Sequence, residues 1–204
     1  MTRRRVRIAL SAALLIAVGG CTTTSSHGDI SSRVTSVPSP VFRPGEIRSV
    51  PDPRTLFSPA LRKELRFDAY DGSECKKDKP NEDIDDWVCY LFTPHQPRRN
   101  TDLLAVLVEL HHPTQVQNAT EFATGDFAAT RQTLGGEWSP AQLGDEALRG
   151  EASGASKVQL RIRNVTMEVS ADIGDPARRT AQEEDRRAWR AATELTRSIT
   201  RLAQ

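Results

Sequence analysis

The first 21 residues constrain this chain most, because they decide which part of it folds and in which compartment. Four arginines within residues 1–7 precede an unbroken apolar and small stretch over residues 8–18, and Gly19, Gly20 and Cys21 follow. Charge, apolar run and small residues occur in the order of an export signal. The run is shorter than the roughly 20 apolar residues of a membrane-spanning helix. We therefore expect residues 1–20 to be a signal peptide and the remaining chain to fold outside the cytoplasm.

The end of this segment indicates lipid attachment. Val18-Gly19-Gly20-Cys21 resembles a lipobox, in which the cysteine receives a diacylglycerol thioether before cleavage between Gly20 and Cys21. Each buried lipid methylene contributes about 0.8 kcal/mol, so a diacyl group with further acylation such as palmitate anchors stably. We expect a lipid-anchored protein on the extracytoplasmic face of the cell membrane. The alternative is an ordinary thiol after an ordinary cleavage site, and the choice between general and twin-arginine export stays open.

Composition divides the mature chain into a tether and one domain. Residues 21–51 are the lipidated N-terminus and a Thr-, Ser-, Pro- and Gly-rich segment, which holds too few apolar residues to offset the entropy of ordering it. Residues 52–204 suit a single domain. Removing four arginines from 28 Lys+Arg leaves 24 against 27 Asp+Glu. This mildly acidic balance argues against nucleic acid as a partner.

Cys75 and Cys89 are the cysteines that follow Cys21. In an oxidising compartment with no other thiol available, a disulfide between them is the expected state. A metal pair and a reactive thiol are the alternatives, but neither has a Cys/His partner set nearby in the sequence.

Apolar periodicity predicts alternating helices and strands before the C-terminal helix. The expected elements are a short helix capped by Ser58, neighbouring strands over 87–92 and 103–110, a helix between 115 and 134, and a hairpin of strands over 157–162 and 165–173. Arg163 and Asn164 would form the tight turn of that hairpin.

A long C-terminal helix is the clearest element, with Asp175 as the expected cap and Pro176 at its first position. Acidic residues in its first half and arginines in its second half complement the helix dipole. Its apolar stripe consists of Ala188, Ala192, Leu195, Ile199 and Leu202. Trp189 lies beside the stripe and is expected in the core. The element order predicts an α+β domain in which helices pack on a mainly antiparallel sheet.

The histidines do not form a recognisable metal motif. His111 and His112 end an apolar strand, where adjacent side chains point to opposite faces and do not easily share one metal ion. The sequence separation of His95 from His111 and His112 does not match the usual spacings of zinc ligands. We expect His111 and His112 to be surface or strand-end residues, and we expect no metal or other cofactor.

An acidic run over residues 82–86 lies between the two cysteines. Several carboxylates could bind calcium, but the spacing is not that of an EF-hand. We expect a solvated loop whose acids pair with Lys76, Lys77 and Lys79. No nucleophile elbow or other local catalytic motif occurs, so no catalytic residue is assigned.

Five segments together resemble a family of actinobacterial lipoproteins of unknown function. They are Asp52-Pro53-Arg54-Thr55-Leu56-Phe57, the strand with Trp87 and Cys89, Leu143-Gly144-Asp145-Glu146-Ala147, residues 161–170 and the final helix. The likeness covers most of residues 52–204. Arg54 stands where that family usually has a cysteine. The family's usual disulfide pattern is therefore in doubt here, and the expected disulfide of this chain joins Cys75 and Cys89.

The arrangement of elements is also similar to the extracellular sensor domains of some mycobacterial serine/threonine kinases. That resemblance implies a curved antiparallel sheet and a binding role. Our first hypothesis is a cell-envelope module that binds a small molecule, a wall polymer or a protein in a groove between sheet and helix. The second is an envelope hydrolase or transferase with a site built from scattered carboxylates and His111 or His112. A wall-spacing structural lipoprotein is the third.

The lipid anchor predicts the behaviour of one variant. Cys21→Ser removes the thiol that accepts the diacylglycerol group, so metabolic labelling with a fatty acid should be lost and the precursor should keep its signal peptide. Labelling and the molecular mass of the cellular protein measure both effects. Normal maturation of this variant would refute the anchor.

Overall fold

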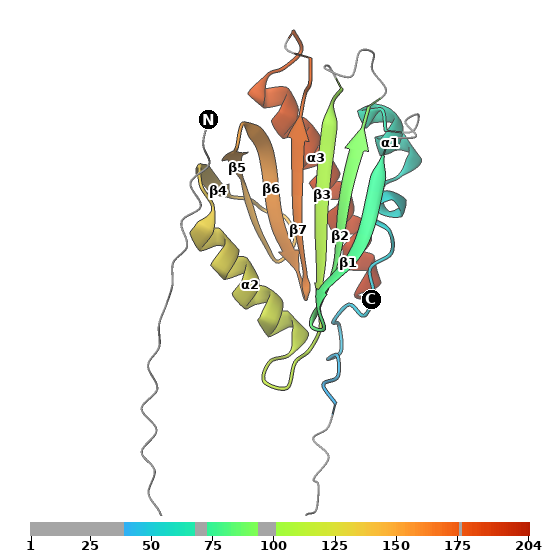
Figure 1. Ribbon diagram of the computed structural model, residues 1–204, viewed down its shortest axis with the longest axis vertical. Helices are drawn as coiled ribbons and strands as arrows, with labels where there is room; N and C mark the ends of the chain where they lie inside the picture. Colours follow the sequence, from blue (N-terminus) through green and yellow to red (C-terminus); the bar gives the residue numbers. More distant parts are fainter. Residues whose placement is uncertain (1–38, 68–72, 94–100, 176) are drawn as a thin grey trace, which may run out of the picture. The chain divides into compact units, whose positions relative to one another are not determined.

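One antiparallel sheet of seven strands organises the part of the chain that the computed structural model describes, which is residues 39–67, 73–93, 101–175 and 177–204 (Figure 1). The strand order is β1-β2-β3-β7-β6-β5-β4. The strands are β1 (Glu74–Asn81), β2 (Ile84–Phe92), β3 (Leu103–His111), β4 (Glu137–Pro140), β5 (Glu146–Ala152), β6 (Ala155–Ile162) and β7 (Val165–Asp172). The helices are the 3-10 turn η1 (Pro53–Leu56), α1 (Pro59–Leu65), α2 (Ala119–Thr133) and α3 (Ala181–Leu202). The predicted α+β class, with a long C-terminal helix, is confirmed.

Helix α3 covers one face of the sheet, behind the strands in Figure 1, and packs on β6 and β7. Alternate residues of β3 from Leu104 to Leu110 are buried on this side. The expected stripe of α3 belongs to the same buried core, except that Leu202 is exposed near the helix end. Each aliphatic side chain that becomes fully buried contributes about 1.5–3 kcal/mol. This apolar seam is the core of the domain.

A buried ion pair fixes α3 against the sheet and against α1. The carboxylate of Asp102, at the start of β3, accepts hydrogen bonds from Arg187 at 2.5 Å and from Arg178 at 2.9 Å. Arg187 also donates to the backbone carbonyl of Leu65 at 2.9 Å, at the end of α1. Because Asp102 and Arg187 are both buried, removal of either would leave an uncompensated charge in the core.

The start of α3 differs from the prediction. The helix begins after Thr180, whose hydroxyl accepts a hydrogen bond from the amide of Glu183 at 3.1 Å. Asp175 instead starts a turn, in which its carbonyl accepts from the amides of Arg178 and Arg179. That turn uses the capping groups of Asp175 locally, so the helix takes the next side chain able to cap it. Pro176 lies outside the described residues.

Helix α2 lies on the other face, in front of the sheet in Figure 1. Asn118 accepts from the amide of Glu121 at 2.9 Å, and the Glu121 carboxylate accepts from the amide of Asn118 at 3.3 Å, which completes a capping box. The predicted helix between residues 115 and 134 is therefore confirmed. Its buried residues, Ala119, Ala123 and Phe127, lie on the side that packs on the strands.

The predicted tether ends before residue 52, but its C-terminal part belongs to the folded domain. Ile47 is fully buried and Val50 nearly so. The buried side chain of Asn164 holds this segment, because it accepts from the Ile47 amide at 2.7 Å and donates to the Ile47 carbonyl at 2.8 Å. It also donates to the carbonyl of His111 at 2.9 Å. One side chain thus joins the incoming chain, β3 and the β6–β7 turn.

The β6–β7 hairpin has the predicted two-residue turn of Arg163 and Asn164. Arg163 adopts a positive φ of 55°, and its amide donates to the Asp145 carboxylate at 2.6 Å. This bond stabilises a backbone conformation that is unfavourable for a residue with a side chain. Gly144, with φ of 63°, lies so close to the carbonyl of Arg161 that an added Cβ would be only 2.6 Å away. Leu143, Gly144 and Asp145 therefore lie in a tight bend that leads into β5 at Glu146.

Asn164→Ala should destabilise the domain strongly. The change leaves one amide and two carbonyl groups without their partner in a buried position, so we expect the free energy of unfolding to fall by about 3 kcal/mol. Chemical denaturation measures the difference. The matched control is Asn81→Ala in the exposed β1–β2 turn, where one hydrogen bond to the Asp83 amide is lost and the expected effect is below about 1 kcal/mol. Equal effects at the two positions would contradict the joining role of Asn164.

Candidate functional site

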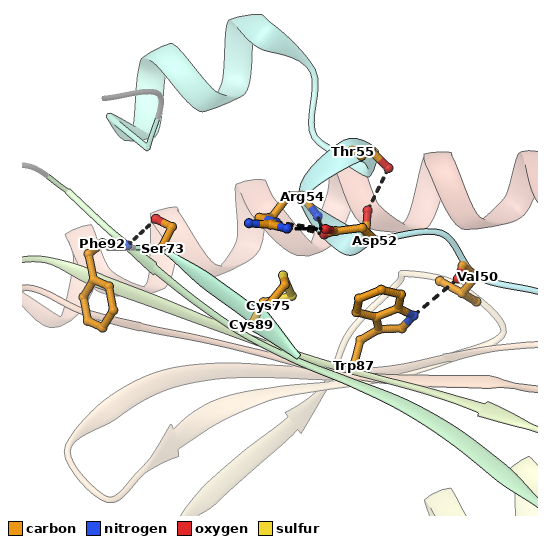
Figure 2. The surroundings of a disulfide bond; sticks show 9 residues. All are labelled: Val50, Asp52, Arg54, Thr55, Ser73, Cys75, Trp87, Cys89 and Phe92. Carbon is orange, nitrogen blue, oxygen red and sulfur yellow. Dashed lines mark hydrogen bonds and ion pairs between the residues drawn. A yellow bond between two sulfur atoms is a disulfide. The ribbon is translucent and has the colours of Figure 1, made fainter. Parts of the chain in front are cut away.

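A disulfide joins Cys75 of β1 to Cys89 of β2, as the sequence predicts (Figure 2). The two residues are opposite one another in the antiparallel register. The bond therefore ties an edge strand to its neighbour. The expected lipidation and cleavage residues, Gly20 and Cys21, lie outside the described residues.

Residues near the domain's N-terminal end cover this disulfide, as Figure 2 shows. The Asp52 carboxylate accepts from the backbone amide of Arg54 at 2.9 Å and pairs with its guanidinium group, and the indole of Trp87 donates to the carbonyl of Val50 at 3.3 Å. Burial raises the pKa of Asp52, but its bonds to Arg54 outweigh burial and hold that pKa below the ordinary value. Asp52 also lies near both sulfur atoms. Because those atoms are bonded to each other, they are not available as metal ligands.

The acidic run over residues 82–86 is not a single loop, because β2 begins at Ile84. Asp85 forms ion pairs with Lys77 at 3.0 Å and with Lys79 at 3.2 Å. Burial raises the pKa of Asp85, but hydrogen bonds from these two lysines outweigh it and hold the pKa below the ordinary value. The predicted pairing is thus confirmed for two lysines, whereas Lys76 pairs with Glu74. Two cations already compensate the most buried carboxylate of this run.

A second group of polar side chains lies between the sheet and α2, and we call it the polar cluster: Glu109, His111, Asp126 and Thr166. Glu109 and His111 are two residues apart on β3, so both point toward α2. Thr166 of β7 is the register partner of Glu109. Asp126 comes from α2, which places it across from the two β3 side chains. Three elements separate in sequence thus bring an imidazole and two carboxylates together.

Hydrogen bonds orient the polar cluster. The hydroxyl of Thr166 donates to the Glu109 carboxylate at 2.9 Å. Since that hydrogen is used, Thr166 accepts from Nε2 of His111, which is 3.2 Å away. The same Nε2 atom lies 3.9 Å from the Asp126 carboxylate. The edge of the Phe122 ring closes the site, with its centroid 5.0 Å from that of His111.

Burial controls the charges of the polar cluster. It raises the pKa of Glu109, with further increases from Asp126, Asp86 and Glu168, while the Thr166 hydrogen bond lowers it. Burial also lowers the pKa of His111, more than the neighbouring Asp126 raises it. His111 is therefore neutral at pH 7. No Lys or Arg of the described residues forms an ion pair with Glu109 or Asp126, so the carboxylates lack a protein cation.

His111 is a strand-end residue, as expected, because it is the last residue of β3. Its side chain has 0% exposure, so it is buried there. His112 lies elsewhere: it packs against Phe42, and its Nε2 is 3.6 Å from Asp85. The two histidines therefore do not meet at one site, in agreement with the strand argument. His95 lies outside the described residues.

Among the described residues, a second notable surface lies on the sheet face beside α2, where this helix does not cover the strands. We call it the open face: Val88, Tyr90, Phe92, Leu103, Ala105 and Leu107. These residues of β2 and β3 alternate with buried core residues, so they point away from α3. Tyr90 is 45% exposed, and the other five residues are partly buried. Lys157 and Glu168 form an ion pair of 2.5 Å on the same face.

Comparison of the chain with protein families, with characterised proteins and with solved structures finds no match. Among the described residues, no helix combines the length and apolar character that crossing a membrane requires. The function proposed below therefore depends on the sequence and geometry of this chain alone.

Glu109→Gln should stabilise the folded protein at neutral pH. Because the folded-state pKa of Glu109 is raised above its unfolded value, ionisation of this carboxyl lowers the stability of the folded protein as pH rises through that range. The amide accepts the Thr166 hydrogen bond without carrying a charge. We expect a higher melting temperature than wild type near pH 7 in a chelator, and a smaller difference below about pH 4, where the wild-type carboxyl is protonated.

The matched control for this pH dependence is Glu151→Gln, which changes an exposed carboxylate of β5. We expect little change in its melting temperature at either pH, because exposed charges interact weakly. A Glu109→Gln protein that melts below wild type at neutral pH, or whose advantage is the same at both pH values, would contradict the burial argument.

Proposed function

We propose that this protein is a lipoprotein anchored by Cys21 to the extracytoplasmic face of the cell membrane, and that its domain binds a protein partner in the cell envelope. The proposal of a lipid anchor rests on the sequence Val18-Gly19-Gly20-Cys21, which follows a basic start and a short apolar run. The Cys75–Cys89 disulfide supports the same location, because such bonds persist in oxidising compartments and are rare in the cytoplasm.

The open face supports the binding role. Its centre is aliphatic and aromatic, and charged side chains such as Lys76 and the Lys157–Glu168 pair lie around it. An apolar centre with Tyr or Phe and a polar rim is the usual composition of a protein–protein interface. Small-molecule sites are concave pockets, whereas these side chains stand in rows along two paired strands, which suits a protein surface better. These features favour a protein ligand over a small molecule or a wall polymer.

The alternative function, an envelope hydrolase or transferase, has less support. Its acid–base groups would be Glu109, His111 and Asp126, which do lie together. However, the His111 side chain is fully buried and its Nε2 atom is hydrogen-bonded to Thr166. A general base must reach the substrate proton directly or through one water molecule, and this imidazole has no contact with solvent.

Site-specific photo-crosslinking in intact cells tests the binding role. A photoreactive amino acid at position 90 should give a discrete protein adduct, since this side chain lies at the centre of the proposed interface. Val116, which is 88% exposed in a loop before α2, is the matched control position and should not give that adduct. The adduct should decrease when Leu107→Asp, a neighbouring change on the same face, is added.

Three outcomes would contradict the proposed interface. They are the absence of an adduct from position 90, the same adducts from positions 90 and 116, and an adduct to a glycan instead of a protein. The first two would remove the open face as a binding surface. The third would reassign its ligand to a wall polymer.

A further inference from the structure

We infer that Glu109, His111 and Asp126 form a binding site for one divalent transition-metal ion of the Zn²⁺ class, a ligand beyond the proposed function. The three residues offer one imidazole nitrogen and two carboxylate oxygens, and these atoms all lie within 4.8 Å of one another. Two of the ligands come from β3 and one from α2. The ion would therefore join the helix to the sheet.

The distances allow such an ion after a small movement of the side chains. Zn²⁺ is bound by nitrogen and carboxylate oxygen at about 2.0–2.2 Å, so two of its ligand atoms in a tetrahedral site lie about 3.3–3.6 Å apart. Nε2 of His111 and the nearer oxygen of Asp126 are 3.9 Å apart. The Asp126 side chain is 36% exposed, so it can rotate toward an ion held by Glu109 and His111.

The excess of carboxylates around Glu109 favours the binding of a cation. Glu109 lies near Asp86 and Glu168 as well as Asp126. Lys157 pairs with Glu168, but within the described parts of the chain no Lys or Arg pairs with Glu109, Asp126 or Asp86. One oxygen of Asp86, Oδ1, is buried without a hydrogen-bond partner. A divalent ion between Glu109 and Asp126 would compensate this local excess of negative charge.

The protonation state of His111 fits metal binding. Burial keeps the imidazole neutral, which is the form that ligates metals. On binding, the hydrogen of Nε2 moves to Nδ1, which has no hydrogen-bond partner among the described residues. Thr166 is not a ligand in this arrangement: its hydroxyl continues to donate to Glu109 and acts as a positioning group.

The donor set selects the class of ion. Mg²⁺ and Ca²⁺ prefer sites made wholly of oxygen atoms, whereas imidazole with carboxylates suits Zn²⁺ and its first-row neighbours. Three protein ligands leave the fourth tetrahedral position for water. With His111 buried under Phe122, the site is better placed to hold α2 on the sheet than to act on a large substrate.

Zinc binding by the full chain, purified in detergent without a histidine tag and stripped with a chelator, tests the site. Competition with a chromophoric chelator should give about one Zn²⁺ per chain, and the melting temperature should rise with Zn²⁺ concentration. Asp126→Asn and Glu109→Gln should each weaken binding at least about tenfold, because each removes a charged ligand. Both variants should fold, since the two amides are close in size to the carboxylates.

His112→Ala is the matched control, because it removes a neighbouring imidazole that faces Phe42 and Asp85; its affinity for Zn²⁺ should equal that of wild type. Co²⁺ in place of Zn²⁺ should give visible absorption bands of a four- or five-coordinate ion that disappear in Asp126→Asn. The proposal is overturned if wild type binds no Zn²⁺, or if Asp126→Asn and Glu109→Gln bind it as tightly as wild type does.

Discussion

The packing of α3 on one face of the sheet is the interaction on which the rest of the structure depends. Helix α3 packs on β6 and β7, and its alanines, Leu195 and Ile199 share one buried core with the aliphatic residues of β3, β6 and β7. The Asp102–Arg187 pair fixes the helix at one end. Because this single seam buries the main apolar surface, the opposite face does not have to be apolar throughout. That face is free to carry polar and partly exposed side chains, and both candidate sites lie there.

The two sites divide that opposite face between them. Near the end of β3, α2 covers Glu109 and His111, and the polar groups are held by one another and by Thr166. Further along β2 and β3, Tyr90 and its neighbours form the open face. The proposed metal site would affect how firmly α2 is held, while the proposed interface lies beside it. The polar groups under the helix and the apolar side chains beyond it would thus have different chemical roles.

The elements with strong apolar periodicity were predictable from the sequence, and those without it were not. Strands β3, β6 and β7 bury one or both faces and show this in their residues, whereas β1 is almost wholly exposed and has the polar sequence of an edge strand. Strand β4 has only four residues and includes Pro140, so its sequence does not show the pattern of a strand. Ile47 is isolated in a polar segment, and its partner Asn164 lies more than 100 residues away in the sequence.

The same reasoning explains what was missed at the candidate sites. The spacing of Glu109 and His111 on one strand places them on one face, and this signal was present in the sequence. Asp126 was hidden because an acid on an amphipathic helix gives no sign of which strand residue it will meet. The disulfide was predictable, since its argument needs only two cysteines and a compartment.

The central claim is that the open face of a membrane-anchored domain is occupied in the envelope. Nitration of tyrosine, read at Tyr90 by peptide mass spectrometry, measures this directly in intact cells and in the purified protein. The account predicts efficient modification of purified protein, because Tyr90 is 45% exposed, and clear protection on cells. Equal modification in the two samples would contradict it.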